Sequence, residues 1–448
     1  MAGLTRLTPV TMAQAMASTN IIAGDTLVIM AGISEGDYTF ATDGTAESRI
    51  TINFEVGAKI KGGLVVNGDY VDVYHPICYG EPDTRETEET GSHPALAEND
   101  GIKVLGANTK VIHPKVYDRI ANGITHWQSA AAADLYGAWT LNNGWTAPDR
   151  NHGHGTYTQN LTGTKTIKHC IWAQGYSGGL RAYATNQYTI GFLIDGCVSI
   201  RDEMLLGSHE PSSDCVVQNC HIFEGYLEIG ETDRDNDDVQ LLNNYVVQDG
   251  ESPLLLRWWA NPTITGNTFV IKNRGNAKLI SWQIHPNPTG ITINNNTYYY
   301  SAQHPSNWDF MTIDVDGNVT NYTKAQWQAL GYDVDSTFIE GLPTTNHIVY
   351  APSDYAVGYG HVVIYNWEGL EDVALDLSSF NLVADTTYRL YNAMNPAEYH
   401  TFVSDGTDSA VSVPMTALDW TVAIPHGALA ALQTITAPDF MTFVLEPA

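Results

Sequence analysis

A short β-type segment recurs six times in the middle of the chain, at residues 166–171, 193–198, 216–221, 241–246, 264–269 and 293–298. The fourth residue of each copy stands at position 169, 196, 219, 244, 267 or 296, so successive copies are 27, 23, 25, 23 and 29 residues apart. A repeat of this length with β patterning predicts a solenoid, in which each coil stacks on the one before it.

A second series of short strands has the same rhythm. Its members are residues 156–159, 180–183, 205–208, 227–230, 256–259 and 280–283. Because alternate residues of a strand face opposite sides, the second and fourth positions are expected to point outward. The fifth strand can start at Leu254, Leu255 or Leu256, and a slip of one residue would exchange Arg257 and Trp259 for Trp258.

The chain divides into four parts by pattern. Residues 1–40 are expected to form a cap and first coil, and residues 41–330 a right-handed parallel β-helix with loop insertions near 81–99 and 128–151. Residues 331–345 are expected to form a linker. Residues 346–448 contain several short strands at roughly ten-residue spacing, which predicts an antiparallel β-sandwich. The predicted fold class is therefore all-β.

Two columns of like residues follow the repeat. Cys170, Cys197 and Cys220 each come directly after a fourth position, which predicts a stack of small buried thiols, with a disulfide between neighbouring coils as the alternative. The fourth positions themselves include Asn219, Asn244, Asn267 and Asn296, and these predict a hydrogen-bonded amide ladder along the coils.

The net charge of −29 argues against nucleic acid and anionic membranes as partners. An acidic polymer would need a local cluster of Arg or Lys to bind here. No stretch reaches the ~18 apolar residues of a membrane span, so no membrane insertion is expected. The first residues lack a signal-peptide pattern, which suggests that a signal was removed or that the protein leaves the cell by another route.

Several stretches resemble a known superfamily. Residues 136–145, 149–160 and 24–29 are similar to bacterial right-handed parallel β-helix proteins of the pectate-lyase-like superfamily, and residues 363–367 and 443–445 are similar to a β-sandwich that often follows such helices. The resemblance implies the fold and leaves the activity open among lyases, hydrolases, epimerases and non-catalytic spikes. No catalytic set of that superfamily maps onto this chain, so no residue role is transferred.

Four residues are candidates for catalysis. In a lyase, Arg181 would hold the carboxylate of a uronate, His154 would remove the C5 proton, and Tyr157 would protonate the leaving oxygen. The alternative for His154 is packing within a tight glycine-rich turn. A hydrolase would instead need two carboxylates roughly 5–9.5 Å apart. Glu228 would be one, with Asp202, Glu203 or Glu231 as the second.

Substrate binding is expected at the outward positions Tyr183, Arg257, Trp259 and Gln283. Aromatic rings and planar charged groups are suited to sugars and their carboxylates. The alternative is a solvated sheet face on which Arg181, Glu228 and Arg257 pair across coils.

Asp233, Asp235 and Asp237 resemble the start of a calcium loop. Asp238 replaces the required glycine and Asn244 the bidentate Glu, so an EF-hand is excluded. A looser Ca²⁺ site and a solvated acidic turn remain as alternatives. No other cofactor is expected.

These features favour an extracellular or virion-associated protein that binds glycans and acts as a polysaccharide depolymerase, a lyase in preference to a hydrolase. The alternative is a non-catalytic structural or adhesive protein, such as a phage tail spike, a capsid decoration or a surface-layer component. The expected partners are a polysaccharide or cell-surface glycan, other virion or surface proteins, and further copies of the chain in a homo-oligomer.

Overall fold

The computed structural model describes residues 10–18, 20–91, 96, 99–231, 235–301, 308–408, 410–416, 420–428 and 439–448. The chain forms two compact units. The first contains Met1–Leu193, Leu206–Cys215 and His426–Ala428, and the second contains Ile194–Leu205, Val216–Pro425 and Leu429–Ala448.

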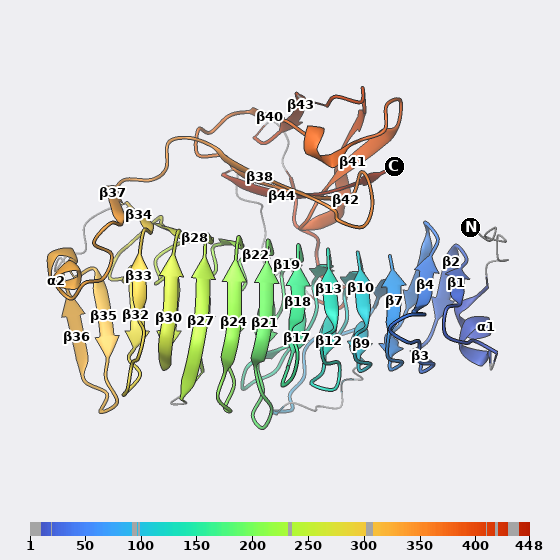
Figure 1. Ribbon diagram of the computed structural model, residues 1–448. Helices are drawn as coiled ribbons and strands as arrows, with labels where there is room; N and C mark the ends of the chain where they lie inside the picture. Colours follow the sequence, from blue (N-terminus) through green and yellow to red (C-terminus); the bar gives the residue numbers. More distant parts are fainter. Residues whose placement is uncertain are drawn as a thin grey trace. The chain divides into compact units, whose positions relative to one another are not determined.

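Apart from the pair β15 and β16, the strands from β1 to β35 fall in turn into three sheets, A, B and C, so that three strands make one coil of a parallel β-helix (Figure 1). Sheet A contains β1 (Thr26–Ile29), β4 (Ile50–Phe54), β7 (Val71–Tyr74), β10 (Lys110–Ile112), β13 (Asp134–Tyr136), β18 (Lys165–Lys168), β21 (Ile190–Asp195), β24 (Ser213–Gln218), β27 (Asn236–Leu242), β30 (Trp259–Thr265) and β33 (Thr292–Asn294).

Sheets B and C have the same stacking. Sheet B contains β2 (Gly32–Glu35), β5 (Ala58–Lys61), β8 (Ile77–Tyr79), β11 (Lys115–Tyr117), β14 (Trp139–Leu141), β19 (Ile171–Ala173), β22 (Val198–Ile200), β25 (His221–Phe223), β28 (Tyr245–Gln248), β31 (Thr268–Ile271), β34 (Thr297–Tyr300) and β37 (Thr337–Glu340). Sheet C contains β3 (Tyr38–Phe40), β6 (Leu64–Val66), β9 (Ile102–Val104), β12 (Ile124–His126), β17 (Thr156–Thr158), β20 (Leu180–Ala182), β23 (Met204–Leu206), β26 (Leu227–Ile229), β29 (Leu254–Arg257), β32 (Ile280–Gln283), β35 (Phe310–Ile313) and the antiparallel β36 (Val319–Tyr322).

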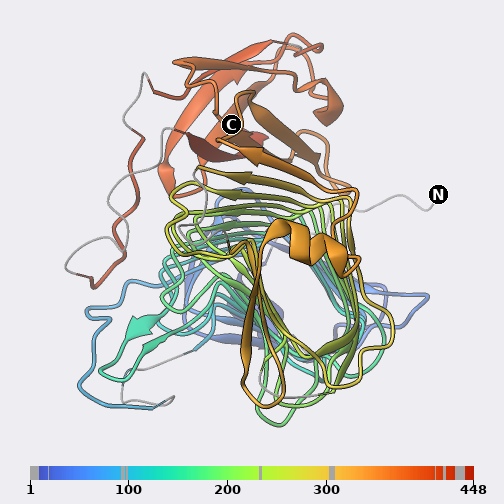
Figure 2. The same ribbon diagram turned by 90° about the vertical axis from the view of Figure 1, so that its left-hand side faces the viewer.

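Alternation of side chains fills the interior of the coils. In β4, Ile50, Ile52 and Phe54 are buried while the residues between them are partly exposed, as expected for strands with one face toward a core. Short helices lie near the ends of the series: α1 (Met12–Ala17) and α2 (Lys324–Ala329). In the second unit α2 lies across the final coils (Figure 2), where Trp327 stacks on Phe310 at 4.5 Å between ring centroids.

The C-terminal residues form antiparallel sheets, as the sequence predicted. One sheet has the strand order β38 (His347–Pro352), β39 (Gly360–Tyr365), β44 (Phe440–Pro447), β41 (Thr387–Asn392) and β42 (Asn395–Val403). A smaller sheet pairs β40 (Asp372–Leu375) with β43 (Val411–Pro414), and η1 (Ser378–Phe380) follows β40. Side chains of both sheets, including Val362, Leu375 and Val413, share one apolar core.

The amide ladder forms, but Asn219 is not part of it. Nδ2 of Asn244 donates to Oδ1 of Asn267 at 2.9 Å, and Nδ2 of Asn267 donates to Oδ1 of Asn296 at 3.1 Å. Asn219 instead has a positive φ of 54° and donates to Asp195. It therefore aligns with Asn243, the residue of left-handed φ that precedes Asn244. Cys220 aligns with the ladder residues, and its backbone N–H donates to the side chain of Asn244. The predicted alignment was wrong there by one residue.

The prediction of buried thiols is confirmed. Cys170, Cys197 and Cys220 are fully buried and unbridged, as are Cys78 and Cys215.

Part of the predicted insertion at 128–151 is regular solenoid, since β13 and β14 lie within it. The departure from the coil is a hairpin of β15 (Trp145–Thr146) and β16 (Asn151–His152). Glu86, from the insertion near 81–99, forms a β-bridge with Thr146. The two insertions therefore support each other.

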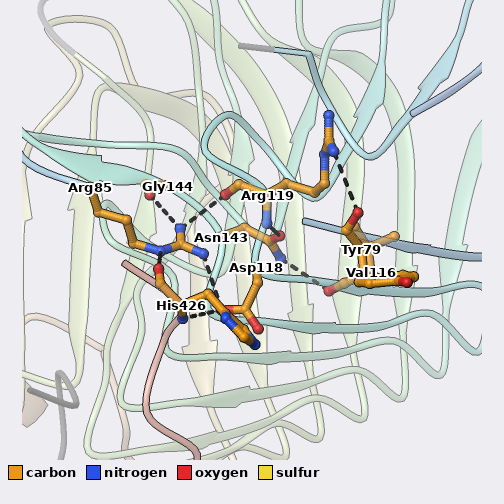
Figure 3. A network of polar contacts seen from close by, with 8 residues as sticks. All are labelled: Tyr79, Arg85, Val116, Asp118, Arg119, Asn143, Gly144 and His426. Carbon is orange, nitrogen blue, oxygen red and sulfur yellow. Dashed lines mark hydrogen bonds and ion pairs between the residues drawn. The ribbon is translucent and has the colours of Figure 1, made fainter. Parts of the chain in front are cut away.

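A buried arginine holds this region of the first unit together (Figure 3). The Arg85 guanidinium donates to the carbonyl oxygens of His426, Gly144 and Arg119 at 2.6, 2.7 and 3.1 Å. It also bonds the Asp118 carboxylate at 3.0 Å, and that carboxylate accepts the N–H of His426 at 3.0 Å. Residues more than three hundred positions apart in sequence thus meet around one charge.

Candidate functional site

Five partly exposed side chains on sheet C of the first unit form a strip that we call the sheet C strip: Lys103, Trp127, Tyr157, Arg181 and Tyr183. The strand register brings them together. Thr125 lies opposite both Lys103 and Tyr157, and Tyr157 lies opposite Arg181 on the next coil. Trp127 lies two residues after Thr125, and Tyr183 lies two residues after Arg181.

Aromatic rings and cations lie side by side along the sheet C strip. The Lys103 ammonium lies 5.9 Å from the centre of the Trp127 ring, and the Arg181 guanidinium lies 4.8 Å from the centre of the Tyr183 ring. The rings of Trp127 and Tyr157 are 6.0 Å apart. Flat apolar rings next to fixed positive charges are suited to a sugar that carries a carboxylate.

An open groove of about 660 Å³ lies beside the sheet C strip. The residues that line it include Trp127, Leu161 and Thr162 and three glutamines, Gln128, Gln159 and Gln187. Amides donate and accept hydrogen bonds, as hydroxyl groups do. The groove thus combines a stacking surface with partners for the hydroxyl groups of a sugar.

His154 does not occupy the position of a surface base. It is buried beneath Tyr157, with the two rings stacked at 5.7 Å. Burial, followed by the charges of Arg181 and His152, lowers the pKa of His154 to about 3. The predicted role as proton acceptor is therefore wrong, because the ring is out of reach of a polymer on the surface; its packing orients Tyr157. Burial also raises the pKa of Tyr157.

A different histidine pairs with the sheet C strip. The Tyr183 hydroxyl and Nε2 of His209 are 3.1 Å apart, and both side chains are partly exposed. This distance allows a proton to pass between phenol and imidazole. Arg181, Tyr183 and His209 therefore combine a carboxylate-binding cation with an acid–base pair.

Glu228 and Arg257 of the second unit pair with each other. Their side chains form an ion pair at 2.8 Å, and only 10% of the Glu228 side chain is exposed. This is the cross-coil pairing that the sequence left as an alternative. The strand β29 begins at Leu254, so Leu255 lies opposite Glu228, and Arg257 lies opposite Gln283. The strand therefore begins at the first of the three starts that the sequence left open, two residues before the 256–259 segment, and Arg257 and Gln283 are partly exposed.

Trp259 is not on sheet C. It is the first residue of β30 in sheet A and is fully buried. The predicted sugar platform at this position is wrong because Trp258, with a φ of 60°, turns the chain out of β29 and directs Trp259 inward.

The predicted calcium ligands have separate protein partners where they are described. Oδ1 of Asp235 lies 3.2 Å from His285, and Asp237 accepts a hydrogen bond from Asn261 at 2.7 Å. Asp233 lies outside the described residues. Within the described part of the chain, no group of three or more His, Cys, Asp or Glu side chains has an arrangement that could hold a metal ion.

The sequence did not identify Lys103, Trp127 or His209. Residues 124–127 continue the second strand series one coil upstream of 156–159, and this signal could have identified Trp127. His209 follows β23 in an irregular segment, and no periodic signal marks it.

None of the helices described is long and apolar enough to cross a membrane. No family model and no curated protein sequence matches the chain. Among solved structures, it is similar to a PL6 family polysaccharide lyase from Pseudopedobacter saltans, with 10% identity, a TM-score of 0.40 and coverage of 74% of this chain and 90% of the lyase.

Two further solved structures are similar. A mannuronic acid specific polysaccharide family 6 lyase from human gut microbiota has 12% identity and a TM-score of 0.40, with coverage of 68% of this chain and 89% of that one. The tailspike receptor-binding protein of bacteriophage Det7 has 10% identity and a TM-score of 0.25, with coverage of 86% and 83%. At these identities the likeness concerns the course of the backbone alone.

Proposed function

We propose that the protein binds an acidic polysaccharide along the sheet C strip of its first unit. The observation that carries this proposal is a set of neighbouring rings and cations on adjacent coils, formed by Lys103, Trp127, Tyr157, Arg181 and Tyr183. The chain as a whole carries a charge of −29 and repels polyanions, so a bound polyanion needs such a local set of cations.

We further propose that the protein cleaves this polysaccharide by β-elimination. Arg181 would pair with the uronate carboxylate and so acidify the C5 proton. His209 would accept that proton, the C5–H electrons would form the C4=C5 double bond, and the C4–O4 bond would break. Tyr183 would donate its proton to the departing O4, and His209 would return a proton to Tyr183 through their hydrogen bond.

The test is incubation with a panel of uronic-acid polysaccharides, followed by the ultraviolet absorbance of the unsaturated product. We expect activity with at least one substrate, and a loss of about 10²-fold or more for Tyr183→Phe and for His209→Ala, in the range for an acid–base group. The control is Tyr226→Phe, whose hydroxyl bonds Glu203 in the second unit. Equal activity of Tyr183→Phe and the wild type would refute the acid–base assignment.

Binding without cleavage would support the non-catalytic alternative, a structural or adhesive component that uses the same strip. Arg181→Ala separates this outcome from a failure of the whole proposal. If wild-type protein binds the polysaccharide and Arg181→Ala does not, the strip is the binding site regardless of catalysis. An extracellular or virion location follows from such a partner and belongs to the same proposal.

A further inference from the structure

Lys165, the first residue of β18, is a buried cation beneath the groove of the first unit. Its side chain is fully buried. Its ammonium group donates to the main-chain oxygens of Gln159, Trp127 and His126 at 2.6, 3.0 and 3.4 Å. Among the described residues, no carboxylate forms an ion pair with it. A buried charge without an opposite partner is unfavourable for folding, so its presence points to another role.

Two of the three oxygens that Lys165 binds belong to residues of the groove. Trp127 and Gln159 both line it, and they follow β12 and β17 on adjacent coils. One ammonium group therefore fixes the main chain of Trp127 and that of Gln159 relative to each other beside the groove. An apolar side chain of similar length would fill the space but would leave these carbonyl oxygens without this donor.

Charge is the second consequence of this position. Lys103 stands over the ring of Trp127 on the exposed side, with its own charge balanced in part by Asp100 at 3.5 Å. Lys165 has no such balance. The ammonium group of Lys165 therefore adds positive charge beneath the groove of a strongly acidic protein, and the field of a buried charge is screened less than that of a surface charge.

We infer that the groove is a subsite for a negatively charged sugar residue of the polysaccharide, and that Lys165 is its positioning residue and the source of its preference for the anion. This inference rests on the proposed function and specifies the substrate class at one place along the sheet C strip.

Protonation of Lys165 provides a readout that packing alone would not give. Burial lowers the pKa of Lys165 to about 7. The titratable ring packed against it is His126, whose pKa burial and the Lys165 charge hold well below the ordinary value. An anion in the groove favours the charged ammonium, so affinity is expected to fall as the pH rises through about 7.

The experiment is titration calorimetry with a hexamer of galacturonic acid and with its neutral methyl ester, at about pH 6 and about pH 8.5, on either side of the Lys165 transition. We expect wild-type affinity for the acid to fall severalfold between these pH values and affinity for the ester to stay constant. Lys165→Met should lose about tenfold in affinity for the acid at the lower pH and lose the pH dependence.

Two variants complete the design. Lys165→Arg keeps a charge at both pH values and should retain acid binding at the higher pH. Lys61→Met changes the net charge equally at an exposed lysine paired with Glu81, and should behave like the wild type.

The outcomes separate the two proposals. Wild-type protein that binds neither hexamer and no acidic polysaccharide of the panel contradicts the proposed function. The inference about Lys165 alone is contradicted by a different result. In that result the wild type binds the acid, and Lys165→Met keeps both the wild-type ratio of acid to ester affinity and the wild-type pH profile.

Discussion

Replacement of Arg85 by Met should destabilise the first unit strongly. The side chain of Arg85 is 1% exposed and that of Asp118 is 15% exposed, so the substitution leaves a largely buried carboxylate without its cation. Burial raises the pKa of Asp118 and lowers that of Arg85, which indicates that desolvation outweighs their attraction. Removal of one partner of such a pair costs roughly 3–5 kcal/mol of unfolding free energy.

The three main-chain oxygens that Arg85 binds add to this effect, since they also lose a donor. The double variant Arg85→Met with Asp118→Asn removes both charges, and the amide oxygen that replaces the carboxylate can still accept from the N–H of His426. We therefore expect the double variant to be more stable than Arg85→Met alone, although Arg85→Met is one substitution closer to the wild type.

Urea unfolding followed by tryptophan fluorescence measures both variants, with limited proteolysis of the 81–91 segment as a local readout. Arg150→Met is the matched control, because Arg150 is 54% exposed and pairs with Asp149 at the surface. Exposed pairs contribute little to stability. A shift for Arg85→Met no larger than that for Arg150→Met would refute the account of the buried cluster.

Three further outcomes are expected. His154→Phe should become more stable relative to the wild type as the pH falls. The pKa of His154 is about 3 in the folded state and 6.5 ordinarily, so the unfolded wild type binds the proton first. Proton binding to the unfolded state lowers the stability of the wild type, and the phenylalanine of the variant has no such proton. The gain should reach about 2 kcal/mol near pH 5 by urea unfolding, and a difference that is constant with pH would contradict it. Asn267→Leu should lower the free energy of unfolding by about 2–4 kcal/mol in thermal unfolding, because the buried amides of Asn244 and Asn296 each lose a hydrogen-bond partner. Asn219→Ala lies outside the ladder and should lower the free energy of unfolding much less. Trp127→Ala should weaken binding of the acidic and the neutral hexamer alike, by calorimetry, which distinguishes stacking from charge.

The periodic parts of the chain were predictable from the sequence. A strand buries every second residue, and each coil must repeat that pattern to continue the stack. The spacing of apolar residues therefore predicts the solenoid. For the same reason Tyr157, Arg181 and Tyr183 were placed correctly on one outward face. Errors arose at turns of one or two residues between strands, at Asn219 and at Trp258, where a residue with a left-handed φ changes which positions of neighbouring coils align.

Sequence alone therefore determined the fold class, the buried thiols and the outward direction of most candidate residues, because these depend on local periodicity. Tertiary structure decided which side chains meet. It buried His154 under Tyr157, placed His209 against Tyr183, and set Lys165 beneath Trp127 and Gln159. These contacts depend on loops and on stacking between coils, where spacing in sequence carries no information about distance in space, and the candidate site is built from them.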